Sequence, residues 1–375
     1  MPAFLGWSCL IALLASCHAA SLPAAEELEE SLQQLRELDS TNTPNSVAAA
    51  WRVVAQADAQ HLPQVLAAIQ GSRPLAANWI RGAVDAMAER ALANKQPLPT
   101  SELEQFIANT RLDPLARRLA FELLRKAEPA LAQRLIPDML QDPSVELRRE
   151  SVALRMEQAQ QSQATGDMQQ ASALFREALD GARDEDQIKL IAHSLRALDQ
   201  PIDLPRHFGF LQQWQVIAPF DNTDQAGLEA IYPPEHGIDL KAEYPGKEGL
   251  ARWQPLTGND DFGMIDLNKP FGKLKEVAGY AWTEFESPDE RQVELRMGCK
   301  NAWKVWVNGE LLFGRNEYHR GMQIDQYRMT AKLKRGTNEI LVKVCQNEQM
   351  ESWTVEWEFQ LRVCDATGTA ILSDE

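Results

Sequence analysis

The chain has 375 residues, of which 44% are hydrophobic and 25% charged, a composition typical of folded rather than disordered proteins. This length suffices for two or three domains of ordinary size. The formal net charge is −16, and the sequence has no basic block that could follow a phosphate backbone. Nucleic acid and anionic membrane surfaces are therefore not expected as partners.

The first residues resemble an export leader. Residues 4–15 are almost entirely apolar, which matches a signal-peptide core and is too short to span a bilayer. Two processing routes remain open: removal of residues 1–19 as a signal peptide, or acylation of Cys17, since Leu14-Ala15-Ser16-Cys17 resembles a bacterial lipobox. Either route predicts an exported protein, periplasmic or extracellular, and the second predicts a lipid anchor. A buried N-terminal helix or a misassigned start is the alternative, because no Lys or Arg precedes the apolar run. No other run approaches ~20 apolar residues, so no membrane span is expected.

Composition changes near residue 200. Only five of the 20 glycines lie in residues 1–200, whereas all five tyrosines and seven of the ten tryptophans lie in residues 201–375. Helix formers followed by Gly- and aromatic-rich segments predict an all-α domain and then an all-β domain. We expect an α-helical repeat domain over 26–200 and an antiparallel β-sandwich over 206–370, joined by a linker at 201–205.

Proline-initiated helices recur in the first part. Arg73-Pro74, Asp113-Pro114 and Asp142-Pro143 each precede a helical pattern, and proline in the first turn after an aspartate is a typical helix start. The D-P-x-x-x-x-R pattern at 142–148 resembles HEAT repeats, and residues 159–178 fit the small and aromatic positions of one TPR-like repeat, without its usual Trp, Leu and Tyr. These resemblances imply a short α-solenoid that binds another protein. An irregular helical bundle is the alternative, because the proline spacings of 40 and 29 residues differ.

Alternating apolar and polar residues predict strands in the second part, beginning with Trp214–Phe220. The others are expected at 277–286, 291–299, 303–307, 311–313, 327–333, 339–345 and 352–363. In the last of these, alternation places Trp353 and Trp357 on one core-facing side. The same parity directs Cys299 into the core and places Cys345 and Lys343 on the outer face. A disulfide framework is not expected from the three cysteines outside the leader.

A hairpin signal is the most informative pattern of the chain. An alternating strand over 302–307 runs into Asn308-Gly309, and a return strand follows over 310–313. Residues 333–344 repeat this scheme. Together these segments resemble the galactose-binding-like jelly roll, especially the non-catalytic sugar-binding domain of family 2 glycoside hydrolases, with its patterns V-W-V-N-G and L-x-x-G-x-N-x-I-x-V-K-V. The resemblance covers about residues 275–364 and implies a sandwich that binds or braces rather than catalyses.

Candidate ligand-binding residues are aromatic and polar side chains near these hairpins. A sugar needs a ring against its C–H face and hydrogen-bonding groups for its hydroxyls. The candidates are Trp306, Tyr318, His319, Arg320 and Tyr327. Trp306 is expected on the outer face of the sheet, and the others lie in or beside the connection between the two signature segments, where loops at a sandwich end often carry binding sites. The alternatives are that another segment covers Trp306 and that the polar residues of the loop only stabilise ordinary turns.

No catalytic or metal motif is recognised. Carboxylates cluster around Ser287-Pro288, which reads as a solvated turn rather than a glycosidase pair: Glu284, Glu286, Asp289 and Glu290. Acidic residues at 221–224 and 259–261 could supply oxygens to Ca²⁺ but lack EF-hand spacing. The six histidines are scattered. We therefore expect no cofactor, no metal and no catalytic residue.

These patterns together predict an exported, non-catalytic scaffold or binding protein. The helical repeats would bind another protein, and the jelly roll would bind a carbohydrate. One alternative is a carbohydrate-binding accessory of a polysaccharide-degrading system. A glycoside hydrolase-like enzyme is the second, and it would require two carboxylates in a deep cleft.

Overall fold

A computed structural model describes residues 21–38 and 44–374 of the chain. It contains two compact units, Met1–Ser194 and Leu195–Glu375. The expected export leader, including Cys17, lies outside the described residues. Within the described residues, no helix has the length and apolar character needed to cross a membrane.

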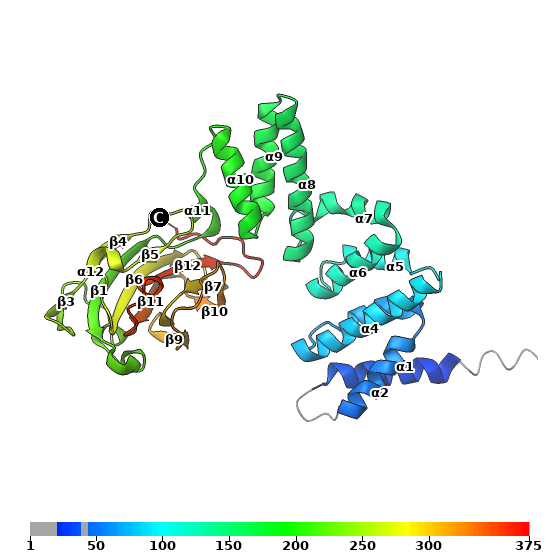
Figure 1. Ribbon diagram of the computed structural model, residues 1–375, viewed down its shortest axis with the longest axis horizontal. Coiled ribbons are helices and arrows are strands. Elements are labelled where there is room, and N and C mark those ends of the chain that lie inside the picture. The colour runs from blue at the N-terminus through cyan, green and yellow to red at the C-terminus, as the bar shows by residue number, and fades with distance from the viewer. Residues whose placement is uncertain (1–20, 39–43, 375) are drawn as a thin grey trace, which may run out of the picture. The chain divides into compact units, whose positions relative to one another are not determined.

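The first unit is helical (Figure 1). Its helices are α1 (Ser21–Arg36), α2 (Pro44–Gln56), α3 (Leu62–Ala67), α4 (Pro74–Ala93), α5 (Thr100–Ala108), α6 (Pro114–Ala127), α7 (Pro129–Leu135), α8 (Val145–Ala164), α9 (Met168–Gly181) and α10 (Glu185–Ala197). Each packs mainly against helices close to it in sequence, such as α1 against α2, α5 against α6 and α8 against α9. Apolar side chains of the helices from α1 to the start of α8 form a continuous core from Leu28 to Leu147.

The residue that caps a helix start agrees with the sequence prediction at α6 and differs from it at α8. Asp113 caps α6 as expected, because its side chain accepts hydrogen bonds from the N–H groups of Leu115 and Ala116. At α8 the cap is Ser144 and not Asp142. Asp142 instead accepts two hydrogen bonds from the Arg117 guanidinium, at 2.7 and 2.6 Å. Both side chains are buried, so this ion pair ties α6 to the start of α8.

The second unit consists mainly of strands, with the short helices α11 (Leu204–Phe208) and α12 (Asn268–Phe271). The strands are β1 (Gln213–Asp221), β2 (Glu243–Pro245), β3 (Leu250–Arg252), β4 (Gln254–Thr257), β5 (Ile265–Asp266), β6 (Val277–Ser287), β7 (Arg291–Cys299), β8 (Ala302–Val307), β9 (Glu310–Arg315), β10 (Tyr327–Leu333), β11 (Gly336–Gln346) and β12 (Glu358–Cys364). Residues 201–205, expected to be a linker, run into α11.

Ten of the strands form two antiparallel sheets that share one core, and β2 and β3 form a separate two-stranded antiparallel sheet. The larger sheet has the order β4-β1-β6-β11-β8-β9, and the smaller has the order β10-β7-β12-β5. Inward side chains of both sheets, including Trp303, Cys299 and Trp357, make up the buried core between them. The chain is thus a protein of helices plus antiparallel sheets. We refer to the two facing sheets as the sandwich.

The β8–β9 turn confirms the hairpin prediction. Asn308 and Gly309 have φ values of 52° and 81°, the positive values that a two-residue turn of the favoured mirror-image type requires. The Asn308 side chain also accepts a hydrogen bond from the Glu339 N–H, at 3.1 Å. The turn therefore fixes both the hairpin and its contact with β11.

The outer face of the larger sheet is covered by the connection between β1 and β4. We call this connection, residues 222–253, the cover segment. Its Leu228, Tyr232 and Ala251 pack on sheet side chains that include Trp306. Lys343 is fully buried there, and its Nζ donates to Glu235 Oε1 at 2.9 Å and to the carbonyls of Leu228 and Ala230 at 3.1 and 2.6 Å.

Two expectations are corrected on this face. Trp306 does point away from the sandwich core, but the cover segment leaves its ring only 7% exposed. Lys343 and Cys345 also lie on the outer face and are likewise buried rather than solvated. Strand parity gives the side of the sheet, whereas the cover is made by residues distant in sequence.

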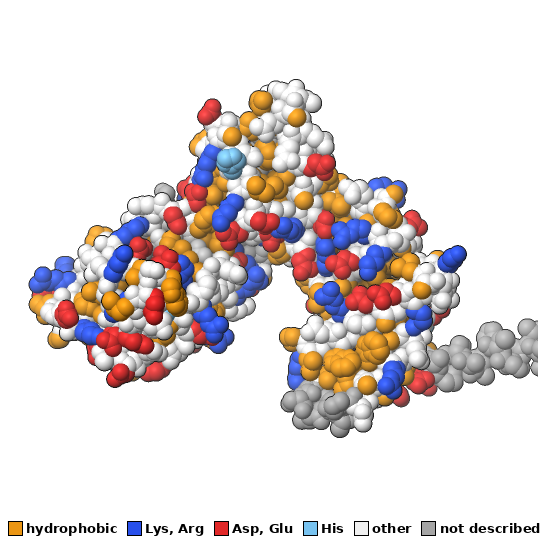
Figure 2. All heavy atoms as spheres, in the orientation of Figure 1, with side chains coloured by type: hydrophobic (Ala, Val, Ile, Leu, Met, Phe, Trp, Pro, Cys, Tyr) orange, Lys and Arg blue, Asp and Glu red, His pale blue; other side chains and the backbone are white. Residues whose placement is uncertain are grey.

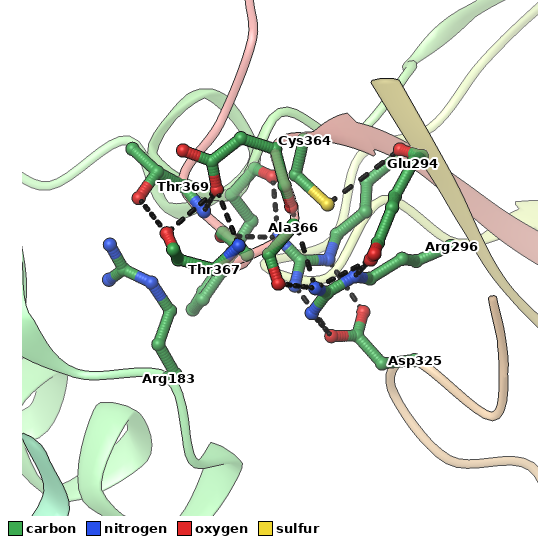
Figure 3. Close-up of polar contacts among 12 residues, drawn as sticks. Arg183, Glu294, Arg296, Asp325, Cys364, Ala366, Thr367 and Thr369 are labelled. Atoms are coloured by element: carbon green, nitrogen blue, oxygen red, sulfur yellow. Dashed lines mark hydrogen bonds and ion pairs between the residues drawn. The ribbon is translucent and has the colours of Figure 1, made fainter. Parts of the chain in front are cut away.

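The outer face of the smaller sheet carries a buried cluster of charges (Figure 3). Arg296 donates to Asp325 at 2.7 Å and pairs with Glu294, also at 2.7 Å. Arg362 donates two hydrogen bonds of 2.6 Å to the same Asp325 carboxylate. The Ala366 carbonyl accepts from Arg296 at 3.1 Å. This cluster binds the loop that carries Asp325 and the C-terminal turn to the sheet.

Candidate functional site

One end of the sandwich brings several connections together. At this end β1, β7, β9 and β11 finish, while β6, β8, β10 and β12 begin. Three of the segments between them concern the site: the start of the cover segment, the β9–β10 connection at 316–326, and the β11–β12 connection at 347–357. Because the sheets hold these segments at the same edge, their side chains meet.

Three rings lie next to each other at this end, and we call Tyr318, His319 and Trp353 the aromatic platform. The centroids of the Tyr318 and His319 rings are 6.1 Å apart. The His319 ring meets the Trp353 ring edge to face, with centroids 5.6 Å apart. Trp353 is 60% exposed, whereas Tyr318 and His319 are half-buried. The platform thus presents an open indole beside two partly anchored rings.

Hydrogen bonds to buried amides hold the first two rings. His319 Nε2 donates to Asn347 Oδ1 at 2.6 Å, since an amide oxygen can only accept. The Tyr318 hydroxyl accepts from Asn222 Nδ2 at 3.1 Å, and Asn222 is fully buried. Burial raises the pKa of Tyr318 above its ordinary value, so its hydroxyl stays protonated. The rings are therefore oriented before any ligand arrives.

Trp353 stands on a short 3-10 turn, η5 (Ser352–Thr354), which is tied down at Thr354. The Thr354 hydroxyl donates to the carbonyls of Gln349 and Glu351, both at 2.8 Å. The backbone carbonyl of Thr354 accepts hydrogen bonds from Lys275 Nζ and from Gln346 Nε2, both at 2.9 Å. The turn that carries the exposed indole is consequently anchored on both sides.

Of the five residues predicted from the sequence, the structure brings Tyr318 and His319 together. Arg320 lies on the same connection, is exposed and pairs with Glu317 at 3.8 Å. Tyr327 is separate from the platform, because its ring packs on Trp303 of the sandwich core with centroids 5.0 Å apart. Trp306 is covered, as described above, and offers no open stacking surface.

Trp353 is the residue that sequence reasoning missed. The expected strand over 352–363 is wrong in its first half, since β12 begins at Glu358 and η5 precedes it. Alternation continues through Trp353 by coincidence. β12 pairs with β7, which ends at Cys299 opposite Phe359, so the strand pairing does not extend back to Trp353.

The described residues show no group of three or more His, Cys, Asp or Glu side chains that could hold a metal ion. Asp221 accepts from the Thr223 hydroxyl at 2.7 Å and pairs with Lys247, and Asp261 forms two hydrogen bonds with Arg196. Among the carboxylates around residue 288, Asp289 pairs with the neighbouring Arg291 and Glu290 with Lys332. Those carboxylates lie at the opposite end of β6 from the platform.

Charge does not single out one region of the face shown in Figure 2. In the view of Figure 2, acidic and basic side chains are interspersed over both units. Near the platform, Glu356 and Glu358 both pair with Lys300, the latter at 3.2 Å. The arrangement therefore suits a ligand that is held by ring contact and hydrogen bonds.

No family model matches the sequence, and no curated protein matches it either. Among solved structures, a family 35 carbohydrate-binding module from Clostridium thermocellum is 14% identical, with a TM-score of 0.18, covering 24% of this chain and 72% of that module. A β-glucuronidase from an uncultured Clostridium species is 11% identical, with a TM-score of 0.25, covering 42% of this chain and 28% of the enzyme. A β-glucosidase from Kluyveromyces marxianus is 9% identical, with a TM-score of 0.25, covering 75% of this chain and 35% of the enzyme. TM-scores this low establish neither a common fold nor a common activity.

Proposed function

We propose that this chain is a non-catalytic binding protein whose aromatic platform binds a glycan. The observation that carries the proposal is the 60% exposed indole of Trp353, set beside His319. The flat indole fits the C–H face of a pyranose, and neighbouring amide and hydroxyl groups can orient sugar hydroxyls. The anchored turn and the buried hydrogen bonds keep the platform in shape, which lowers the entropic cost of binding.

The proposal assigns no reaction to the platform. Glycoside hydrolysis needs two carboxylates that flank the scissile bond at a defined separation. At this end Glu356 and Glu358 are engaged by Lys300, and Glu317 lies beside Arg320. We therefore assign these carboxylates to ion pairs that shape the loops. We also propose that the sandwich is a galactose-binding-like jelly roll. The hairpin at Asn308-Gly309 supports this assignment.

The test is retention of the full chain by a panel of soluble and insoluble polysaccharides. Trp353→Ala should weaken binding about tenfold or more, which corresponds to ~1.4 kcal/mol. Met350→Ala is the matched control, because Met350 is 75% exposed on the same connection but belongs to no ring contact. Absence of wild-type binding to every member, or equal binding by Trp353→Ala, would reject the proposal.

A second function, protein binding by the helical unit, is favoured by a groove on that unit. This groove has a volume of about 400 Å³ and is lined by side chains of α4, α6, α8 and α10. Leu115 and Leu119 line it beside Arg118 and Arg149, so it offers both apolar contact and charge. The recurring Asp-Pro helix starts and the Arg117–Asp142 pair support a HEAT- or TPR-like solenoid as its frame. The apolar leader sequence supports export.

Cross-linking can test the groove. A photoreactive residue replacing Ala153, which lines the groove, should capture one specific partner in cells. The same replacement at Ala130, an exposed position on α7 outside the groove, should not. Identical products from both positions would reject the groove as the binding surface.

A further inference from the structure

Strand β9 is an unpaired edge of the larger sheet. Within the described residues it pairs only with β8, so its other side offers free backbone N–H and C=O groups. Its sequence, Glu-Leu-Leu-Phe-Gly-Arg, contains no Lys or Pro that would discourage pairing. Leu311 and Phe313 are 49% and 39% exposed. Apolar side chains on an open edge are a template for another strand.

Pairing with β8 defines which side chains of β9 face which side of the sheet. Leu311 and Gly314 lie opposite Trp306 and Lys304, whose side chains point to the outer face. Glu310, Phe313 and Arg315 lie opposite Val307, Val305 and Trp303, which belong to the inner core. Leu312 is the extra residue of a bulge and also packs against the inner core. Four residues of β9 therefore face inward and two outward.

This strand is complementary to itself in antiparallel register. When two copies meet about a two-fold axis between Leu312 and Phe313, Glu310 faces Arg315, Leu311 faces Gly314 and Leu312 faces Phe313. Side chains that face each other in an antiparallel pair share one face of the sheet. All of these pairs obey that rule, because inward residues meet inward ones and outward residues meet outward ones. Each end of the interface then has one Glu–Arg pair.

We propose that two copies of the chain dimerise by antiparallel pairing of their β9 strands, which joins their larger sheets into one. Within the described residues Glu310 and Arg315 form no ion pair, and Arg315 lies over the Phe313 ring, 4.9 Å from its centroid; the dimer supplies an ion-pair partner for each. Gly314 has no side chain, so the exposed Leu311 of the partner can lie over it. The charge complementarity comes from the chain's own sequence, which favours a second copy over an unrelated peptide.

A groove beside the strand provides space for the partner's inward side chains. It has a volume of about 460 Å³ and is lined by Glu310 and Leu312 of β9 and by Thr330, Ala331 and Lys332 of β10. In the dimer, Leu312 and Phe313 of one copy approach this groove of the other. The interface thus combines backbone hydrogen bonds, apolar contact and two charge pairs.

The test is the mass in solution over a concentration series of full-length protein, measured by sedimentation or by light scattering. Wild type should reach twice the monomer mass of 42.1 kDa. Glu310→Arg and Arg315→Glu each place like charges opposite one another at both ends, and each should weaken dimerisation tenfold or more. The double variant restores both pairs in reverse and should dimerise within a few-fold of wild type.

Arg328→Glu is the control, since it makes the same change on the exposed edge of β10 and should leave the dimer intact. Circular dichroism of every variant checks that it is folded. Wild type that stays at 42.1 kDa at all concentrations would overturn the proposal. A double variant as monomeric as the single ones would overturn it too, because rescue depends on the register.

Discussion

Two tryptophans of the second unit show how little a residue's type says about its role. Alternation predicts a strand at both Trp306 and Trp353, yet the first is 7% exposed and the second 60%. The first is part of the core beneath the cover segment, and the second is the open ring of the aromatic platform.

The same substitution should separate these roles. Trp306→Ala removes a buried ring and should lower the free energy of unfolding by about 3–5 kcal/mol. Trp353→Ala removes an exposed ring and should change it by no more than about 0.5 kcal/mol. Urea unfolding followed by circular dichroism measures both. Equal losses of unfolding free energy in the two variants would show that Trp306 is not buried or that Trp353 is not exposed.

Asp325 is the other residue on which local structure depends, because it faces two buried arginines. Burial alone would raise the pKa of this carboxyl, but the hydrogen bonds and charges of Arg362 and Arg296 lower it below its ordinary value. A depressed pKa stabilises the folded state fully above the unfolded pKa of about 3.9. That contribution is lost as the pH falls through the folded pKa.

Asp325→Asn should therefore destabilise the protein by about 3–5 kcal/mol near neutral pH, since it leaves two buried cations without their carboxylate. The difference from wild type should begin to shrink below about pH 4, where Asp325 of the unfolded chain takes up a proton, and should vanish only below the lowered pKa of the folded state. Asp289→Asn, which removes one partner of an exposed pair with Arg291, is the control. A difference that stays constant from pH 7 to pH 3 would contradict this account.

At the scale of elements, a buried ion pair and its hydrogen bonds fasten the cover segment to the larger sheet, in addition to the pairs of Glu229 with Lys304 and of Lys247 with Asp221. Glu235 accepts from Lys343 at 2.9 Å and from the Tyr280 hydroxyl at 2.5 Å. Burial raises the pKa of Tyr280 well above its ordinary range, so this hydroxyl remains a donor. The segment is thereby fastened to the middle strands of the larger sheet.

Breaking this pair from one side should loosen the cover segment. Lys343→Met leaves the Glu235 carboxylate without its cation and should cost about 3–5 kcal/mol. Combining Lys343→Met with Glu235→Leu should cost clearly less than the sum of the single losses, because no charge then stays unpaired. Hydrogen exchange should rise over 222–253 in the single variant. Unchanged exchange there would mean that the pair does not hold the segment.

The elements that the sequence predicted best are those fixed by local patterns. The Asn308-Gly309 hairpin and the strands from β6 to β11 follow from turn chemistry and alternation within a few residues. Cover over Trp306 was an alternative that the sequence left open, but the covering segment could not be identified, because it comes from residues 222–253, far from Trp306 in the sequence. The platform was predicted only through Tyr318 and His319, since alternation wrongly extended a strand over Trp353. Local periodicity determines which way a side chain points but not what lies above it.

For the whole molecule, the role that we propose is binding. The helical unit has a groove of mixed character, and the second unit carries the platform at one end of its sandwich. Charge is spread over the face shown in Figure 2, which favours recognition by contact over recognition by long-range attraction.

The central claim, that a glycan covers the aromatic platform, is tested most directly by hydroxyl-radical footprinting with mass spectrometry. In the presence of a saturating polysaccharide retained by the wild type, oxidation of Trp353 and His319 should fall several-fold. Met168, which is 49% exposed on the helical unit, should be oxidised at its original rate. Trp353 oxidation that does not change at saturation would contradict the account, because the sugar would then be bound elsewhere.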